Sequence, residues 1–311
     1  MRKLSTSVLI STYNGEKYII EQLVSIRNQS VPVDEVIIRD DQSSDHTAKV
    51  VEEYIEKNDL KQWKLIRNTQ NMGWKRNFHC GMDDCTKDLI FLCDQDDIWN
   101  VDKVKDMVEV MSNNSSINVL VSDFSLKYEN NVKDSRYDVF KGEMNNSGHL
   151  QQLHFDSRWP YIKRPGCTYC VRKSFFMEIQ EFWDERISHD GILWRFSMAS
   201  DSLWKLQKNE IQFRRHGGNV TGTRELSIAS RLEEINLFIL SFRQVYKYCK
   251  KRGDLEKCQL LKRGLKWLTI RKEMFQQRKC WLWFILALRY EKYYSSYKGL
   301  LGDVLYYFKG V

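Results

Sequence analysis

Three aspartates stand close together behind an apolar segment in the sequence FLCDQDDIW, residues 91–99. Asp94, Asp96 and Asp97 cannot all remain ionised at such short spacing without a cation, because like charges raise one another's pKa. Carboxylate oxygens suit Mg²⁺ and Mn²⁺, and Mg²⁺ commonly binds one or two carboxylates together with the phosphates of a substrate. The pattern therefore predicts a site for a divalent cation. The alternative is an acidic turn that caps a helix beginning near Trp99.

A second acidic pair follows another apolar segment, in the sequence IIRDDQSSD. Asp40 and Asp41 close that segment, and Ser44 is the predicted N-cap of a helix from Asp45 to about Glu56. One cap does not explain two acids before it, so these carboxylates are candidates to accept hydrogen bonds from a nucleotide base or a ribose. The chain has no GxGxxG motif after its first apolar segment and no GxxxxGK[ST] motif. Their absence argues against dinucleotide and P-loop sites.

Short apolar segments alternate with segments of helical periodicity through the first half of the chain. Strands are predicted at residues 7–13, 35–40, 63–68, 88–94 and 117–123, and helices at 15–28, 45–56, 73–85 and 101–111. This alternation predicts a mostly parallel sheet with helices on both faces. Ligands bind beyond the carboxyl ends of the strands in such sheets. The acidic pairs, the segment Thr12–Asn14 and Asp123 should therefore converge on one rim.

The charge of the chain is distributed unevenly. Residues 224–311 contain 19 Lys and Arg against 8 Asp and Glu, a net charge of +11, whereas residues 1–223 carry a net charge of −3. Such asymmetry suggests a polyanionic partner for the C-terminal part, either anionic lipid or nucleic acid. No signal peptide and no apolar run of about 18 residues is visible, so we expect a cytoplasmic protein. Eight scattered cysteines, including the single Cys167–Cys170 pair, are interpreted as free and mostly buried thiols.

Four segments in order carry a resemblance to a known family: VLISTYNGEKYIIEQLVSIRNQ, EVIIRDDQSSDHT, NMGWKRNF and LIFLCDQDDIW. Together they resemble the catalytic domain of glycosyltransferase family 2, which has the GT-A fold, a Rossmann-like α/β fold. With the later HD pair and an Arg-x-His-x-x-Asn-like element, they resemble bacterial rhamnosyltransferases and related enzymes of capsule and O-antigen synthesis. The resemblance implies a catalytic domain at residues 1–223, with a nucleotide-sugar half to about 125 and an acceptor half at 126–223. A basic, aromatic-rich helical extension follows at 224–311.

The resemblance also implies which residues bind the donor nucleotide. They are Thr12, Tyr13, Asn14, Glu16, Asp40, Asp41, Asn71, Gly73, Lys75, Asp94 and Gln95. Asp96 is implied to meet the metal-bound diphosphate. Asp97 is left between a third rim acid and a helix cap.

The pair His189-Asp190 matches the family's acceptor-side motif, which implies that Asp190 is the general base, with His189 beside it. A sugar hydroxyl must lose a proton as it attacks the anomeric carbon, and a nearby carboxylate can accept that proton. The alternative is an ordinary helix N-terminus. Gly191 stands where the family usually has an aromatic residue, which implies a looser acceptor pocket.

The segment FRRHGGNVTG, residues 213–222, resembles the family's closing loop. The resemblance implies His216 as a second metal ligand, and Arg214, Arg215 and Asn219 as diphosphate or loop residues. The alternative for His216 is a purely structural role.

The implied activity is metal-dependent, inverting transfer from dTDP-rhamnose or a UDP-hexose to a saccharide, free or linked to polyprenyl diphosphate. The C-terminal stretch RKCWLWFILALRYEKYY predicts amphipathic helices. They would either contact an anionic membrane at the inner face of the plasma membrane, or pack as a hairpin or a homodimer interface. Two other function classes stay open: a nucleotidyltransferase, and a nucleic-acid-binding protein that uses the basic tail.

Overall fold

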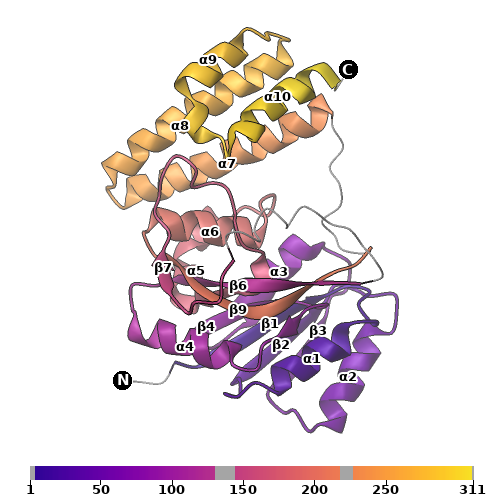
Figure 1. Ribbon diagram of the computed structural model, residues 1–311. Helices are drawn as coiled ribbons and strands as arrows, with labels where there is room; N and C mark the ends of the chain where they lie inside the picture. The colour runs from indigo at the N-terminus through magenta and orange to yellow at the C-terminus, as the bar shows by residue number, and fades with distance from the viewer. Residues whose placement is uncertain (1–3, 130–143, 218–226, 310–311) are drawn as a thin grey trace.

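The computed structural model describes residues 4–129, 144–217 and 227–309. A nine-stranded mixed sheet forms the centre of the larger part of the molecule (Figure 1), in the order β3-β2-β1-β4-β8-β6-β9-β5, with β7 paired to β9. The strands are β1 (Thr6–Thr12), β2 (Glu35–Asp40), β3 (Trp63–Arg67), β4 (Leu89–Asp94), β5 (Ile98–Trp99), β6 (Val119–Tyr128), β7 (Leu150–Gln152), β8 (Tyr169–Arg172) and β9 (Leu203–Arg215).

The helices fall into two sets. Those of the sheet region are α1 (Ile19–Arg27), α2 (Thr47–Lys57), α3 (Trp74–Asp84), α4 (Lys103–Asn113), α5 (Lys173–Ile179) and α6 (His189–Ala199). Those of the C-terminal region are α7 (Ile228–Lys251), α8 (Leu255–Gln276), α9 (Leu282–Arg289) and α10 (Tyr297–Lys309). The described residues also contain three short 3₁₀ helices: η2 (Gly166–Thr168), η3 (Gln180–Phe182) and η4 (Glu291–Tyr293).

The predicted alternation of strands and helices is confirmed for the first half of the chain. Strand β1 pairs in parallel with both β2 and β4, and β2 pairs in parallel with β3. Successive side chains of a strand point to opposite faces of the sheet. Val8 and Ile10 therefore pack with the hydrophobic core under α1, α2 and α4, and Leu9 packs with the core under α3, α5 and α6. Both faces are covered, as Figure 1 shows.

The direction of the strands changes beyond β4. Strand β8 is antiparallel to β4 and to β6, whereas β9 runs parallel to β6. Sequence periodicity did not predict β5, β7, β8 or β9, because three of them are four residues or shorter and β9 carries many polar residues.

Two local predictions were wrong, and one open alternative is excluded. Helix α2 begins at Thr47, and the carboxylate of Asp45 accepts the Thr47 backbone N–H at 2.9 Å, so Ser44 is not its N-cap. Asp97 does not cap a helix, because strand β5 follows it and α4 begins only at residue 103. Asp123 does not close its strand, which continues to residue 128. Its buried carboxylate accepts a hydrogen bond of 2.6 Å from Arg164 Nη2.

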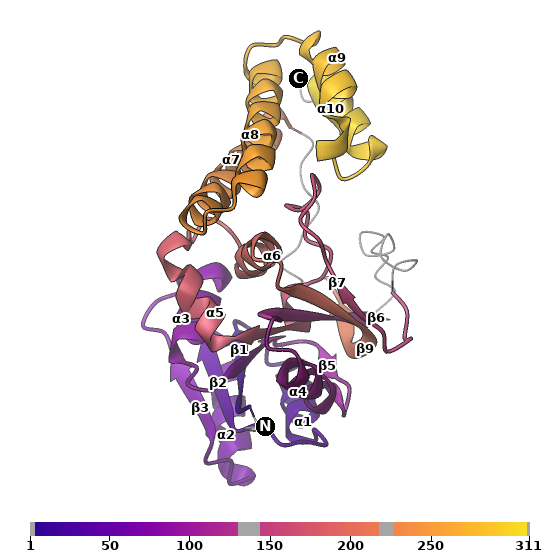
Figure 2. The same cartoon turned by 90° about the vertical axis from the view of Figure 1, so that its left-hand side faces the viewer.

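The C-terminal helices form a separate layer above α6 (Figures 1 and 2). The predicted break near Arg252-Gly253 separates α7 from α8, with Gly253 at a φ of 75°. Two further breaks, before α9 and before α10, were not predicted. The buried carboxylate of Asp303 on α10 accepts hydrogen bonds from Arg231 on α7 and Arg271 on α8, and so ties the layer together. Among the described residues, no helix has the length and apolar character needed to cross a membrane.

Candidate active site

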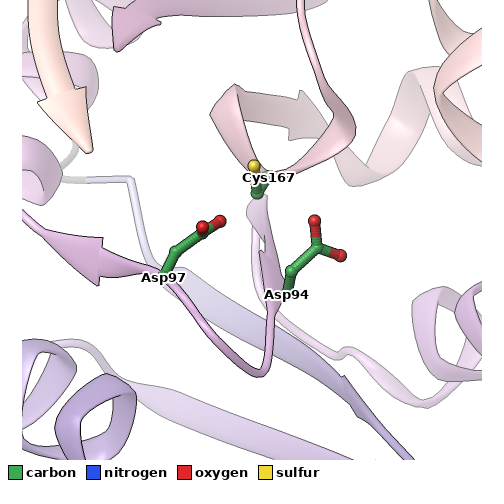
Figure 3. Close-up of side chains that lie close together, drawn as sticks. All are labelled: Asp94, Asp97 and Cys167. Atoms are coloured by element: carbon green, nitrogen blue, oxygen red, sulfur yellow. The ribbon is translucent and has the colours of Figure 1, made fainter. Parts of the chain in front are cut away.

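The turn between β4 and β5 brings two of the predicted acids together (Figure 3). Asp94 ends β4, Asp97 precedes β5, and the thiol of Cys167 on η2 lies between them. One ligand atom from each of the three residues lies within 4.8 Å of the others. Asp97 is buried. Its Oδ1 accepts the backbone N–H of Arg214 at 2.9 Å, and its Oδ2 has no hydrogen-bond partner among the residues that the structure describes.

The electrostatics of this turn favour the binding of a cation. Burial and the neighbouring carboxylate of Asp96 raise the pKa of Asp94 to about 7 and the pKa of Asp97 well above its usual range. The buried ammonium of Lys103 lies nearby, but it donates to the carbonyl oxygen of Cys167 at 2.8 Å and lies 4.0 Å from the centre of the Trp99 ring. The negative charge of the turn is therefore not cancelled by a direct ion pair with Lys103.

The donor atoms fit Mg²⁺ or Mn²⁺ through oxygen rather than sulfur. Burial raises the pKa of the Cys167 thiol well above its usual range, so it stays protonated and is a poor ligand. The carboxylates of Asp94 and Asp97 are hard oxygen donors, and an unpartnered buried oxygen such as Asp97 Oδ2 is rare in a folded protein. Sequence reasoning missed Cys167 at this site, since nothing in the local sequence links residue 167 to residue 94.

The two residues predicted as metal ligands, Asp96 and His216, lie together next to this turn. His216 Nε2 is 2.8 Å from Asp96 Oδ2, and the Tyr18 ring lies against the imidazole at a centroid distance of 4.5 Å. The structure thus brings Asp96 and His216 into one pair beside Asp94 and Asp97. Their metal ligation stays a prediction.

Arg214 holds the acidic turn in place. Besides its backbone bond to Asp97, its Nε donates to the carbonyl oxygen of Asp96 at 2.7 Å. Its guanidinium forms ion pairs with Glu21 at 2.7 Å and with Glu129. The side chain of Arg214 is buried and its charge is matched by two carboxylates, so it positions the acidic turn in this structure. Its predicted diphosphate or loop role stays a prediction.

Two other residues of the predicted closing loop give less information. Arg215 is buried, and its guanidinium lies 5.4 Å from the centre of the Phe213 ring. Asn219 lies outside the described residues. The diphosphate or loop roles predicted for both stay predictions.

The carboxylates of Asp40 and Asp41, which follow β2, accept hydrogen bonds from other groups of the protein. Asp40 Oδ1 accepts from Thr12 Oγ1 at 3.1 Å, and Asp40 Oδ2 accepts from the backbone N–H of Ser43 at 3.0 Å. Asp41 accepts three hydrogen bonds of 2.8 to 2.9 Å, from Asn68 Nδ2 and from the backbone N–H groups of Met72 and Gly73. Both carboxylates are buried and hold loops together. Their predicted contact with base or ribose stays a prediction.

The loop after β1 is also held by side chains of the predicted site. Gln95 makes two hydrogen bonds with the Tyr13 backbone, of 2.9 and 3.0 Å, and Asn14 Oδ1 accepts the Ser44 backbone N–H at 2.8 Å. Glu16 accepts the backbone N–H of His46 at 2.9 Å. The ring of Tyr13 is left about half exposed at the mouth of the sheet, where an aromatic face can contact a base.

The loop before α3 connects the donor side of the site to the acceptor side. Asn71 Oδ1 accepts the backbone N–H of Gly73 at 3.1 Å, and Gly73 has a φ of 82°, which favours glycine. Lys75 Nζ donates to the carbonyl oxygen of Arg186 at 2.7 Å, just before α6. Trp74, which sequence reasoning missed, is 38% exposed beside this contact.

Asp190 lies in the first turn of α6, where the partial positive charge of the helix N-terminus favours a carboxylate. Ser188 caps the helix by accepting the Gly191 backbone N–H. The charge of Asp190 contributes to the raised pKa of Asp94, so the two acids, about a hundred residues apart in the chain, interact across the site. The segment carrying Cys167 passes between them. A Cβ atom on Gly166 would lie 2.5 Å from His189 Nε2, which explains the glycine.

His189 packs in the core behind Asp190. Its ring stacks on Phe78 at a centroid distance of 3.9 Å, and within the described chain neither ring nitrogen has a hydrogen-bond partner. Burial lowers the pKa of His189 to about 4, so the imidazole is neutral at pH 7. This environment favours a packing role and gives no support to the predicted catalytic role.

The fold and the clustered acids define a class of protein, and comparison with known families identifies it. Residues 7–180 match the family model of Glycosyl transferase family 2, so the chain belongs to this family and is a glycosyltransferase. The predicted resemblance is thereby confirmed, and the nucleotidyltransferase and nucleic-acid-binding alternatives are set aside.

Among characterised relatives, the chain is similar to the dTDP-rhamnosyl transferase RfbG of Shigella flexneri, with 28% identity over 243 residues, 73% of this chain and 78% of RfbG. It is also similar to the poly(ribitol-phosphate) beta-N-acetylglucosaminyltransferase TarS of Staphylococcus aureus, with 34% identity over 117 residues. That match covers 37% of this chain and only 20% of TarS.

Solved structures support the fold. The crystal structure of S. aureus TarS in complex with UDP-GlcNAc superposes with a TM-score of 0.63 at 18% identity, covering 99% of this chain and 82% of the other. The complex of TarS with UDP gives a TM-score of 0.61 at 20% identity, covering 99% and 81%. The predicted GT-A fold with additional C-terminal helices is confirmed.

Proposed function

We propose that this glycosyltransferase moves a sugar from dTDP-rhamnose or a UDP-hexose to a saccharide acceptor, with inversion at the anomeric carbon and with Mg²⁺ or Mn²⁺ as cofactor. One observation carries the proposal. Asp94 and Asp97 lie beside Cys167, the neighbouring Gly166 packs against Asp190 at the start of α6, and the charge of Asp190 contributes to the raised pKa of Asp94.

Asp190 is the proton acceptor in this proposal. The acceptor hydroxyl becomes a competent nucleophile as its proton passes to the carboxylate, and attack opposite the leaving diphosphate inverts the anomeric carbon. Asp190 lies in the first turn of α6, at the N-terminal end of the helix. His189 and Gly166 fix the position of that helix end through packing.

Asp94 and Asp97 are the residues that would hold the cation, with the Asp96–His216 pair beside them. A bound divalent cation neutralises the charge that develops on a leaving nucleoside diphosphate. Two hydrogen bonds hold the turn between β4 and β5 in position. Arg214 on β9 donates to the carbonyl oxygen of Asp96, and Gln95 donates to the carbonyl oxygen of Tyr13.

The relatives support the choice of donors and acceptors. RfbG is named for dTDP-rhamnosyl transfer, and TarS has been solved with UDP and UDP-GlcNAc, so both nucleotides are candidates. The name of TarS describes transfer to a polymer, poly(ribitol-phosphate), and by analogy the proposed acceptor is a surface polysaccharide. A polyprenyl-diphosphate-linked saccharide would bring the enzyme to the cytoplasmic face of the membrane.

Helices α9 and α10 support a peripheral membrane contact. Each presents a row of exposed apolar side chains three or four residues apart, which places them on one face of its helix. The rows are Trp281, Phe284 and Leu288, and Tyr297, Leu301, Leu305 and Phe308. Exposed Arg278, Arg289, Lys292 and Lys298 accompany them, as expected for contact with anionic lipid. The alternative is a homodimer through the same faces, and sedimentation of the protein with and without anionic vesicles separates the two.

A panel of nucleotide sugars tests the proposed function, with hydrolysis and transfer as readouts. We expect one donor to be consumed in the presence of Mn²⁺ and not in the presence of a chelator. Asp190→Asn should lower the rate by about 10² to 10⁴ with nucleotide binding retained, the range typical of a lost general base. Full activity of Asp190→Asn would contradict the assignment of the base.

A further inference from the structure

A hollow of about 520 Å³ lies between α7, α8 and the segment that leads into α6. We call it the basic hollow. The residues of its lining that matter here are three cations, Arg186, Arg243 and Lys272, and three apolar residues, Ile239, Leu240 and Leu265. Its volume falls within the range of small-molecule sites, about 300 to 1,000 Å³.

The lining carries positive charge that the protein neutralises only in part. Arg186 pairs with Asp184, with Nε and Nη2 at 2.9 and 2.7 Å from its carboxylate oxygens. Arg243 and Lys272 make no hydrogen bond or ion pair with any part of the chain that the structure describes. None of the lining residues is acidic. The hollow therefore suits an anion.

The apolar part of the lining indicates which kind of anion the hollow would bind. Ile239, Leu240 and Leu265 are half-buried beside the three cations, so a ligand with both a charged and a hydrocarbon part would satisfy the whole surface. No aromatic ring lines the hollow, whereas single-stranded nucleic acids are usually bound by stacking on aromatic side chains. An amphiphilic phosphate fits better than a nucleic acid.

One lining residue of the hollow is close in the sequence to the proposed proton acceptor. Arg186 precedes Asp190 by four residues, and its carbonyl oxygen accepts the hydrogen bond from Lys75 at 2.7 Å. Figure 2 shows α7 and α8 extending away from the sheet from beside α6. A ligand held by Arg186, Arg243 and Lys272 can therefore direct an attached sugar toward the start of α6.

We propose that the basic hollow binds the diphosphate of a polyprenyl-diphosphate-linked acceptor. Arg186, Arg243 and Lys272 contact the phosphates, Ile239, Leu240 and Leu265 contact the first isoprene units, and the saccharide extends toward Asp190. This inference rests on the proposed function, for which it names the element that recognises the acceptor.

Binding of farnesyl diphosphate to the full chain tests the inference, with inorganic diphosphate and farnesol as the comparison ligands. We expect farnesyl diphosphate to bind at least about tenfold more tightly than either, because farnesol lacks the charged contacts and inorganic diphosphate lacks the buried hydrocarbon. The double variant Arg243→Gln/Lys272→Gln should lose about tenfold or more of that affinity. The variant Lys247→Gln/Lys266→Gln, with the same charge change on exposed positions of α7 and α8, should bind as the wild type does.

Three results would overturn the inference. Inorganic diphosphate binding as tightly as farnesyl diphosphate would exclude a lipid ligand and favour a phosphodiester polymer. Equal losses in the two double variants would exclude the hollow as the site. If the wild-type protein hydrolyses a nucleotide sugar but does not bind farnesyl diphosphate, the proposed binding role of the hollow is refuted and the proposed function is not. If it hydrolyses no nucleotide sugar, the proposed function is refuted.

Discussion

Two acidic pairs follow strands on either side of β1, and they differ in how the protein satisfies them. All four carboxylate oxygens of Asp40 and Asp41 accept hydrogen bonds from the protein. Asp97 is equally buried, but its Oδ2 has no partner among the described residues, and its pKa and that of Asp94 are raised by burial and by neighbouring acids. A satisfied buried carboxylate stabilises the fold, whereas an unsatisfied one is available to a ligand.

The largest expected effect is the loss of activity in Asp97→Asn. Removing this carboxylate should lower kcat/KM by about 10² to 10³, a range typical of lost electrostatic stabilisation at a reacting centre. The free energy of unfolding should stay the same or rise, because the amide oxygen can still accept the Arg214 backbone N–H and a buried group that is costly to ionise is replaced by a neutral one. Steady-state kinetics and urea unfolding measure the two quantities. A large loss of stability with little loss of activity would show that Asp97 stabilises the fold, as Asp40 and Asp41 do.

Asp41→Asn should show the opposite pattern. The amide cannot accept all three hydrogen bonds that hold residues 68, 72 and 73, so the free energy of unfolding should fall by about 2 to 4 kcal/mol. Urea unfolding of Asp41→Asn, measured together with that of Asp97→Asn, tests this prediction. If Asp41→Asn instead keeps wild-type stability and loses nucleotide affinity, Asp41 contacts the nucleotide as the sequence predicted.

His189 tests whether a missing hydrogen-bond partner alone marks a functional residue. Its pKa is about 4 in the folded protein, below the ordinary value of 6.5, so the unfolded chain binds more protons between these pH values. Stability should therefore fall as pH falls from about 6.5 to 4, by about 3 kcal/mol from this residue. His189→Gln should show a smaller fall over the same range. Equal pH dependence in both proteins would show that His189 is not buried as described.

Gly166→Ala is expected to have the smallest effect. It changes the segment that lies between Asp94 and Asp190. The new methyl group would lie 2.5 Å from His189 Nε2 and 3.4 Å from the Asp190 Cβ, and overpacking of this kind costs about 1 to 3 kcal/mol. We expect a modest loss of stability and a lower kcat as the start of α6 shifts. Gly217→Ala is a useful control, because no residue that the structure describes lies within 4 Å of its added Cβ.

Sequence periodicity was enough to predict the parallel half of the fold. The alternation of short apolar runs with helical segments located β1 to β4 and α1 to α4, and the end of β4 located Asp94. The short strand β5 could not be predicted from two residues, so Asp97 was left between a rim acid and a helix cap.

Contacts between distant segments could not be predicted in the same way. Cys167 reaches Asp94 only because η2 packs against β4, and Arg214 reaches Asp97 only because β9 pairs with β5. The identity of Arg214 suggested a phosphate contact, and only its partners Glu21 and Glu129 show that its charge is already engaged. Local patterns carry no information on such partners.

Asp94 and Asp97 after β4 are proposed to bind a divalent cation together with the donor diphosphate. Calorimetric titration of dTDP and UDP, with Mn²⁺ and with a chelator, tests it most directly. We expect at least one nucleotide to bind about tenfold or more tightly with Mn²⁺, and Asp97→Asn to abolish this difference. Equal affinity with Mn²⁺ and with the chelator in the wild-type protein would contradict it.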